Sequence, residues 1–216
     1  MRAGRLWMVM GGCLAIGLAC VAGCAEETTG EASPAIEGMF LEPAMTLVGK
    51  PAPQFSLELL DGANMSLEQH KGKQIVVLDF FATWCPPCRM VMPALVSIID
   101  EYARKDKQEG REQQVVLYAV SLGDPPEAIR QFQKQLGVTF PVALDKRLVA
   151  AKLYKVNPIP HKVLIGKDGT VQAVHLGAGS PGARTLEELL AGYKKQLRQE
   201  LDALIAGKSL VKPKRQ

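Results

Sequence analysis

The chain has 216 residues, and its 26 lysines and arginines exceed its 22 acidic residues by a formal net charge of +4. This excess is small and the charges are mixed along the sequence, which argues against a nucleic-acid partner. The length suffices for one domain with a substantial core, and no internal repeat is visible.

The first residues have the features of an export signal. Arg2 and Arg5 precede an uncharged apolar stretch over residues 6–20, which is somewhat short for a membrane-spanning helix and has signal-peptide flanks. The segment Val21-Ala22-Gly23-Cys24 resembles a bacterial lipobox, whose cysteine becomes the acylated first residue of the mature protein. We therefore predict a lipoprotein signal peptide over 1–23 and lipidation at Cys24. An uncleaved anchor and an ordinary secretory signal are the alternatives, and all three export the domain.

Export also accounts for the five cysteines. Cleavage before Cys24 would remove Cys13 and Cys20, and acylation would occupy Cys24. Cys85 and Cys88 would then be the only free thiols, in a compartment where disulfides persist.

Residues 24–46 are rich in Glu, Thr, Gly, Ser, Ala and Pro and show little periodicity. This composition predicts a flexible tether, and about twenty such residues would reach on the order of 25 Å. The protein is therefore expected on the extracytoplasmic (periplasmic) side, anchored to the membrane by its lipid. A folded domain is predicted over 47–207 and a solvated basic tail over 208–216.

Within the domain, strand patterns alternate with helix patterns and then give way to a terminal hairpin and helix. Turns at Asp61-Gly62 and at Asp168-Gly169 predict two hairpins. Asp124 is expected to cap one helix, Pro93 to kink another, and Thr185 to open the last through a capping box. Strands are expected at 53–59, 64–67, 75–81, 115–121, 140–144, 162–165 and 171–176, and helices at 89–105, 124–136, 146–154 and 185–206. This order predicts an α/β fold with a central mixed β-sheet flanked by helices.

The most informative motif is Cys85-Pro86-Pro87-Cys88, at the junction of a predicted strand and a predicted helix. A helix N-terminus favours a thiolate at the first cysteine, because its N–H groups are unpaired and its macrodipole is positive there. A thiolate attacks disulfides, and a thiol three residues on can resolve the mixed disulfide. The motif therefore predicts dithiol redox catalysis by Cys85 and Cys88, without a cofactor.

Other uses of the cysteine pair remain open. A structural disulfide would close a very short loop and restrict the unfolded chain little. A metal site would need further ligands, whereas His70, His161 and His175 show no ligand-type spacing, so we expect no metal. The alternative function is a non-enzymatic lipoprotein or a metallochaperone. A peroxiredoxin would need Thr three residues before its reactive cysteine, where this chain has Ala82.

From about residue 47 to residue 207, the chain resembles the TlpA/ResA-like family of extracytoplasmic thioredoxin-fold oxidoreductases. The motif that is most specific for this family is Leu78-Asp79-Phe80-Phe81-Ala82-Thr83-Trp84-Cys85-Pro86-Pro87-Cys88. Pro51-Ala52-Pro53-Gln54-Phe55-Ser56-Leu57 and Val156-Asn157-Pro158-Ile159-Pro160 support it. The resemblance implies a thioredoxin-like fold with an N-terminal hairpin and an extra strand-helix unit over about 121–154.

The resemblance also implies roles for residues around the dithiol. Pro160 matches a cis-proline that faces the cysteines, and a cis Ile159–Pro160 bond would present the Ile159 backbone to a substrate peptide. Asp79 matches a buried acid beneath the resolving cysteine, where a raised pKa would allow it to exchange a proton with Cys88. Trp84 would pack beside the site, with a simple core tryptophan as the alternative.

Two positions depart from the family. Many members carry a glutamate three residues after the second cysteine, where this chain has Val91, so Asp79 would relay the proton alone. Where two hydroxyl residues often follow the cis-proline, this chain has His161 and Lys162. These two residues could alter partner choice or electrostatics near Cys85, but a surface strand position is the favoured interpretation of His161.

The loop between the cysteines bears on the direction of electron flow. Pro86 and Pro87 lack N–H groups, so the Cys85 sulfur has few backbone donors beyond that of Cys88, although Arg89 would oppose this effect. A less stabilised thiolate favours the disulfide form, as in a reductant. Together with the resemblance, this favours a reductase. The resemblance alone implies that a membrane thiol-disulfide electron donor feeds it and that it acts on oxidised exported proteins such as apocytochrome c.

Overall fold

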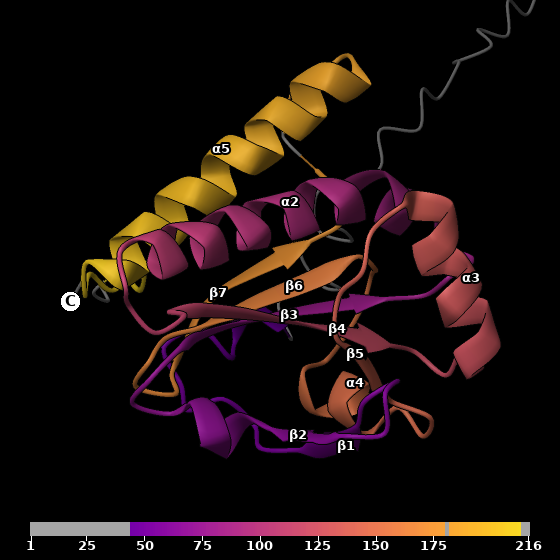
Figure 1. Ribbon diagram of the computed structural model, residues 1–216, viewed down its shortest axis with the longest axis horizontal. Helices are drawn as coiled ribbons and strands as arrows, with labels where there is room; N and C mark the ends of the chain where they lie inside the picture. The colour runs from indigo at the N-terminus through magenta and orange to yellow at the C-terminus, as the bar shows by residue number, and fades with distance from the viewer. Residues whose placement is uncertain (1–43, 180–181, 213–216) are drawn as a thin grey trace, which may run out of the picture. The chain divides into compact units, whose positions relative to one another are not determined.

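The computed structural model describes residues 44–179 and 182–212 (Figure 1). The predictions for the signal peptide, for Cys24, for most of the tether and for the end of the basic tail lie outside these ranges. Within them, no helix combines the length and the apolarity that crossing a bilayer requires.

A five-stranded mixed sheet lies at the centre of the described domain, in the order β5-β4-β3-β6-β7. The central strand β3 (Ile75–Phe81) pairs in parallel with β4 (Val115–Ser121) and antiparallel with β6 (His161–Ile165). The outer strands are β5 (Val142–Leu144), parallel to β4, and β7 (Val171–Leu176), antiparallel to β6. The predicted mixed sheet is confirmed, and every residue of β3 is buried because both faces of the sheet are covered.

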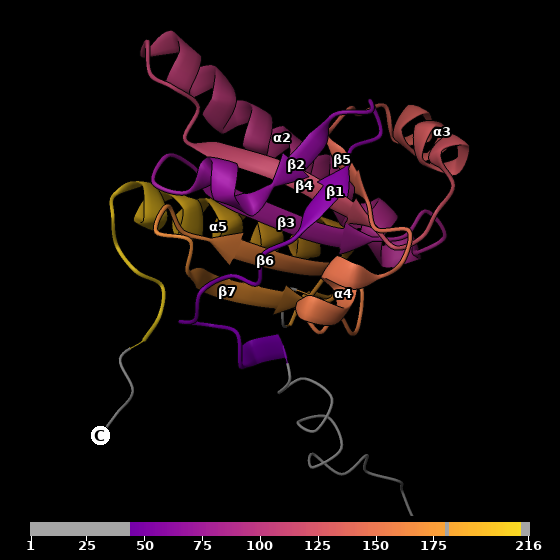
Figure 2. The ribbon, with the colours of Figure 1, turned by 90° about the horizontal axis from the view of Figure 1, so that it is seen from below.

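Helices α2 (Pro86–Gln108) and α5 (Leu186–Ile205) cover one face of this sheet (Figure 1). The other face carries α4 (Val149–Leu153) and the hairpin of β1 (Ser56–Glu58) and β2 (Asn64–Ser66), which lie in front of the sheet in Figure 2. Successive strand side chains point to opposite faces, so β3 supplies Val77 and Phe81 to one core and Leu78 and Phe80 to the other. The core on the α2 side also contains both cysteines.

Three local predictions about the helices can be compared with the structure. Thr185 caps α5 as predicted, because its hydroxyl accepts a hydrogen bond from the Glu188 N–H at 3.1 Å. Pro93 lies inside α2, which continues to Gln108, so the helix does not end at this proline. The kink at Pro93 stays a prediction. The predicted capping role of Asp124 is wrong: the N-cap of α3 (Pro126–Leu136) is Pro125, and the Asp124 carboxylate binds elsewhere.

Chain segments at both ends of the described region pack on the domain. Ala44 and Leu47 are buried in the core on the hairpin side. At the other end, Ser209 and Leu210 donate hydrogen bonds to the buried Gln172 side chain at 3.0 and 3.1 Å.

Candidate functional site

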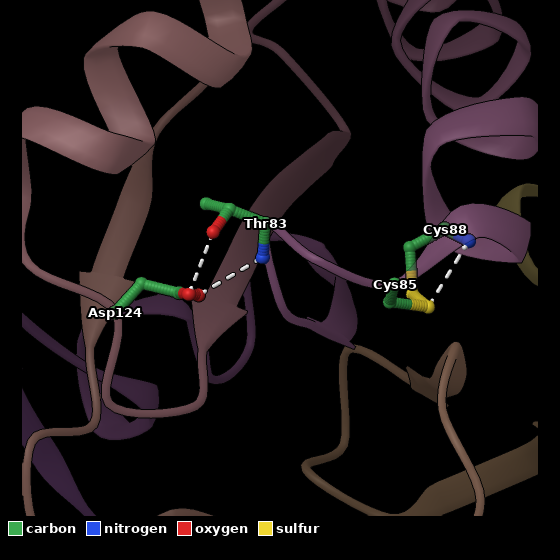
Figure 3. Close-up of a disulfide and its surroundings, with 4 residues drawn as sticks. All are labelled: Thr83, Cys85, Cys88 and Asp124. Carbon is green, nitrogen blue, oxygen red and sulfur yellow. Dashed lines mark hydrogen bonds between the residues drawn. A yellow bond between two sulfur atoms is a disulfide. The ribbon is translucent and has the colours of Figure 1, made fainter.

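Cys85 and Cys88 form a disulfide at the N-terminus of α2 (Figure 3). Cys85 is the N-cap residue, and its Sγ accepts a hydrogen bond from the Cys88 N–H at 3.2 Å. Pro86 and Pro87 fill the first two helical positions and have no N–H to offer. Cys85 is 3% exposed and Cys88 fully buried, so an incoming sulfur meets Cys85 first.

Trp84, next to the disulfide in the chain, is 71% exposed. The alternative that it is a core residue is therefore wrong, and its indole is available to a partner. The Ile159–Pro160 peptide bond is cis, as the resemblance implied, and so is Asn157–Pro158, which was not expected. Ile159 is half-buried and packs against the core that contains both cysteines.

The loop that leads from β3 to Cys85 is held by Asp124 (Figure 3). The Asp124 carboxylate accepts hydrogen bonds from the Thr83 N–H at 3.1 Å and from the Thr83 hydroxyl at 2.7 Å. The Ser121 hydroxyl at the end of β4 also donates to it, at 2.8 Å. Sequence reasoning assigned Asp124 to the following helix and missed this contact. The available signal was the parallel pairing of β3 with β4, which brings the loops after their C-terminal ends together.

Arg89 is engaged with α3. Its guanidinium donates a hydrogen bond to the Gln135 side chain at 2.8 Å and lies 5.2 Å from the ring centroid of Phe132. Hydrogen bonding and cation–π contact therefore hold this charge on the α3 side.

Asp79 lies on β3 and is 1% exposed. Its neighbours on the same strand face, Val77 and Phe81, belong to the core that contains the cysteines, so its carboxyl also points to that face. The Oδ2 atom has no hydrogen-bond partner among the described residues. Burial raises the pKa of Asp79 above its ordinary value, and the charge of Lys162 opposes this shift. The direction agrees with the acid that the resemblance implied.

The expectation that His161 is a surface residue is wrong. His161 is fully buried, and within the described residues neither ring nitrogen has a hydrogen-bond partner. Its ring meets that of Phe80 edge-on, with 5.7 Å between the centroids. Burial, aided by the charge of His175, lowers the pKa of His161 to about 4. The physical reason is topological: β6 is an inner strand of the sheet, and a hydrophobic core covers each face of the sheet, so every residue of β6 is buried.

Lys162 is also buried, at 6% exposure, and points to the opposite face of β6. It is the direct partner of Asp79 in the register of β3 and β6. Its Nζ lies 3.9 Å from the ring centroid of Tyr193 on α5. Burial lowers the pKa of Lys162, and the charges of Asp79 and Glu200 oppose this shift. The sequence departure at Lys162 therefore places an ionisable group beside the candidate proton carrier.

The part of the chain that the structure describes contains no set of side chains suited to bind a metal ion. No group of three or more His, Cys, Asp and Glu side chains there could hold an ion. The metallochaperone alternative therefore gains no support from these residues.

Comparison with known proteins finds relatives over most of the described domain. A family model described as the AhpC/TSA family matches residues 48–174, more than half of the chain. The chain is 33% identical to the thiol-disulfide oxidoreductase ResA of Bacillus thuringiensis over 161 residues, which cover 74% of this chain and 84% of that protein. It is 34% identical to the thioredoxin-like protein YneN of Bacillus subtilis over 154 residues, covering 71% and 78%.

A solved structure agrees with this relationship. The crystal structure of a proposed thiol:disulfide interchange protein DsbE from Chlorobium tepidum has a TM-score of 0.56 and 28% sequence identity. The match covers 73% of this chain and 97% of that one. The thioredoxin-like fold predicted from the sequence is thereby confirmed.

Proposed function

The chain belongs to the ResA-like thioredoxin-fold thiol-disulfide oxidoreductases, and from this membership we propose that it is a membrane-anchored, extracytoplasmic reductase of disulfides in exported proteins such as apocytochrome c. The observation that carries the proposal is the Cys85–Cys88 disulfide at the N-terminus of α2, with Cys85 as the more exposed of the two residues.

The proposed cycle begins with the reduced dithiol. The Cys85 thiolate attacks a substrate disulfide, forms a mixed disulfide and releases one substrate thiolate. Cys88 then loses its proton and attacks the Cys85 sulfur, which releases the second substrate thiolate and forms the Cys85–Cys88 disulfide. Two electrons pass to the substrate, and a membrane dithiol donor restores the reduced form. In this scheme Asp79 accepts the proton of Cys88, and both substrate thiolates take up protons from solvent.

The surroundings of the cysteines support a substrate site here. Trp84 offers an exposed aromatic surface beside Cys85. We assign the backbone of Ile159, before Pro160, to pairing with the extended substrate segment that carries the disulfide. The sulfur of Cys85 accepts one hydrogen bond from the loop backbone, and Arg89 is engaged with α3, so a thiolate there gains limited stabilisation. This environment favours the oxidised protein and supports the role of a reductant.

Membrane anchoring enters the proposal from the sequence. Cys24 and residues 1–23 lie outside the described residues, and the lipobox-like segment supports lipidation at Cys24. The composition of the tether would let the dithiol move near the bilayer, where a membrane electron donor can reach it.

Trapping of mixed disulfides tests the cycle. Cys88→Ser should accumulate mixed disulfides between Cys85 and oxidised exported proteins, because the resolving thiol is absent, whereas Cys85→Ser should trap none and have no turnover. Equal trapping by both variants would contradict the assigned roles. Rapid alkylation of Cys85 in the reduced protein would exclude an inert structural disulfide.

The reduction potential of the Cys85–Cys88 couple tests the direction of electron flow. A value near the roughly −270 mV of thioredoxin would support a reductase, whereas a value near the roughly −120 mV of DsbA would indicate an oxidase.

A further inference from the structure

We propose that Lys162 is a positioning residue for catalysis: its charge keeps the buried Asp79 carboxyl able to accept and return the proton of Cys88. The inference rests on the proposed function, in which Asp79 is the proton carrier. Lys162 itself touches neither sulfur in this scheme and acts through Asp79.

The register of the sheet brings the two groups together. Asp79 on β3 and Lys162 on β6 are direct cross-strand partners, and such partners project from the same face of a sheet. That face is covered by α2, which carries Cys88, and by α5, which carries Tyr193. The Lys162 Nζ lies 3.9 Å from the Tyr193 ring centroid. The ammonium group is thus held by the ring of Tyr193 on the strand face shared with Asp79.

Charge balance explains why this pairing matters. A buried carboxylate is costly unless an opposite charge or hydrogen bonds stabilise it. Among the described residues, the Asp79 Oδ2 atom has no hydrogen-bond partner, and Lys162 is the charged group that lowers the pKa of Asp79 against burial. Without Lys162, Asp79 would stay protonated to higher pH and could not take the proton of Cys88 during resolution.

The remaining ionisable groups that face Lys162 come from α5 and β7. Glu200 on α5 favours the charged form of Lys162 and pairs with His175 on β7, with 3.0 Å between Oε2 and Nε2. The Tyr193 hydroxyl is buried, and within the described residues it has no hydrogen-bond partner. Lys162, His175 and Tyr193 also line a pocket of about 430 Å³ between β7 and α5. Lys162 therefore lies at the wall of a pocket, whereas the Asp79 carboxyl beside it is 1% exposed.

The first test measures the titration midpoint of the Asp79 carboxyl directly, without catalysis. The ¹³C chemical shift of this carboxyl is recorded by NMR as a function of pH in the oxidised full-length protein. In Lys162→Met, which keeps the apolar length of the side chain, the midpoint should rise by about 1 pH unit or more. Lys195→Met removes the same charge from an exposed position of α5 and should leave the midpoint unchanged. An unmoved midpoint in Lys162→Met, or an equal shift in Lys195→Met, would overturn the inference.

The second test links the pair to the reaction. The pH profile of mixed-disulfide resolution should shift upward in Lys162→Met by the same amount as the carboxyl midpoint. In an Asp79→Asn background, which should lack the inflection, Lys162→Met should leave the resolution profile unchanged, because Lys162 acts through Asp79. A change of the profile in that background would overturn the inference. Failure of Cys88→Ser to trap substrates would instead contradict the proposed function. Far-UV circular dichroism verifies folding, and Lys162→Gln serves the same tests if Lys162→Met does not fold.

Discussion

Asp124, in the loop between β4 and α3, accepts hydrogen bonds from both the backbone N–H and the hydroxyl of Thr83, two residues before Cys85 (Figure 3). The Ser121 hydroxyl donates to the same carboxylate. A carboxylate that accepts three hydrogen bonds stabilises the loop more than a neutral acceptor would. The path of the chain toward Cys85 is thus set by a residue from the loop that follows a neighbouring strand.

Asp124→Ala should therefore destabilise the oxidised protein by about 2 kcal/mol, because it leaves the partly buried donors of Thr83 without their charged acceptor. Denaturant unfolding measures this loss. Thr83→Val is the matched control: it removes the hydroxyl donor and keeps the backbone one, so its effect should be smaller. If Asp124→Ala unfolds at the same denaturant concentration as the unmodified protein, the contact has no stabilising role.

The sequence predicted the sheet and the dithiol because their signals are local. The apolar run of β3 and the helix that begins after Cys85 each follow from neighbouring residues. The environments of His161 and Lys162 depend instead on the inner place of β6 in the sheet and on the elements packed on both sheet faces. The partner of Asp124 depends on the pairing of β3 with β4. These are tertiary relationships, and the sequence of one segment contains no local signal for them.

The proton-relay role of Asp79 predicts a selective kinetic defect. Asp79→Asn removes the proton acceptor for Cys88, so resolution of the mixed disulfide should slow at neutral pH more than the initial attack by Cys85. Stopped-flow measurement of the two steps separates these effects. Unchanged resolution kinetics would remove Asp79 from the mechanism.

The pH dependence of that defect has a definite sign. Because the pKa of Asp79 is raised, the carboxylate that accepts a proton is lost at a higher pH than for an ordinary aspartate. Resolution by the unmodified protein should therefore slow as pH falls through the raised pKa of Asp79. The Asp79→Asn variant should lack this inflection.

Anchoring predicts a specific chemical species at the N-terminus. If Cys24 is acylated, mass spectrometry should find it as the modified first residue, and the protein should partition with membranes. Each buried acyl methylene contributes roughly 0.8 kcal/mol, so several chains hold firmly. Cys24→Ala should block processing and leave a precursor that keeps its leader. An unmodified first residue other than Cys24 would indicate a soluble exported protein, and an intact Met1 leader would indicate a signal anchor.

His161 predicts a sensitivity of stability to mild acid. Its pKa is lowered to about 4 in the folded protein, against about 6.5 in the unfolded chain. The unfolded state therefore binds a proton first as pH falls, and stability is lost progressively between about pH 6.5 and about pH 4. Between about pH 7 and about pH 5, protonation linked to His161 alone should lower the free energy of unfolding by about 2 kcal/mol.

His161→Leu should abolish this pH-dependent component. The substitution should be tolerated at neutral pH because neither ring nitrogen has a hydrogen-bond partner among the described residues. Denaturant unfolding of both proteins across this range is the measurement, and parallel pH profiles would show that the buried imidazole is not the acid-sensitive group.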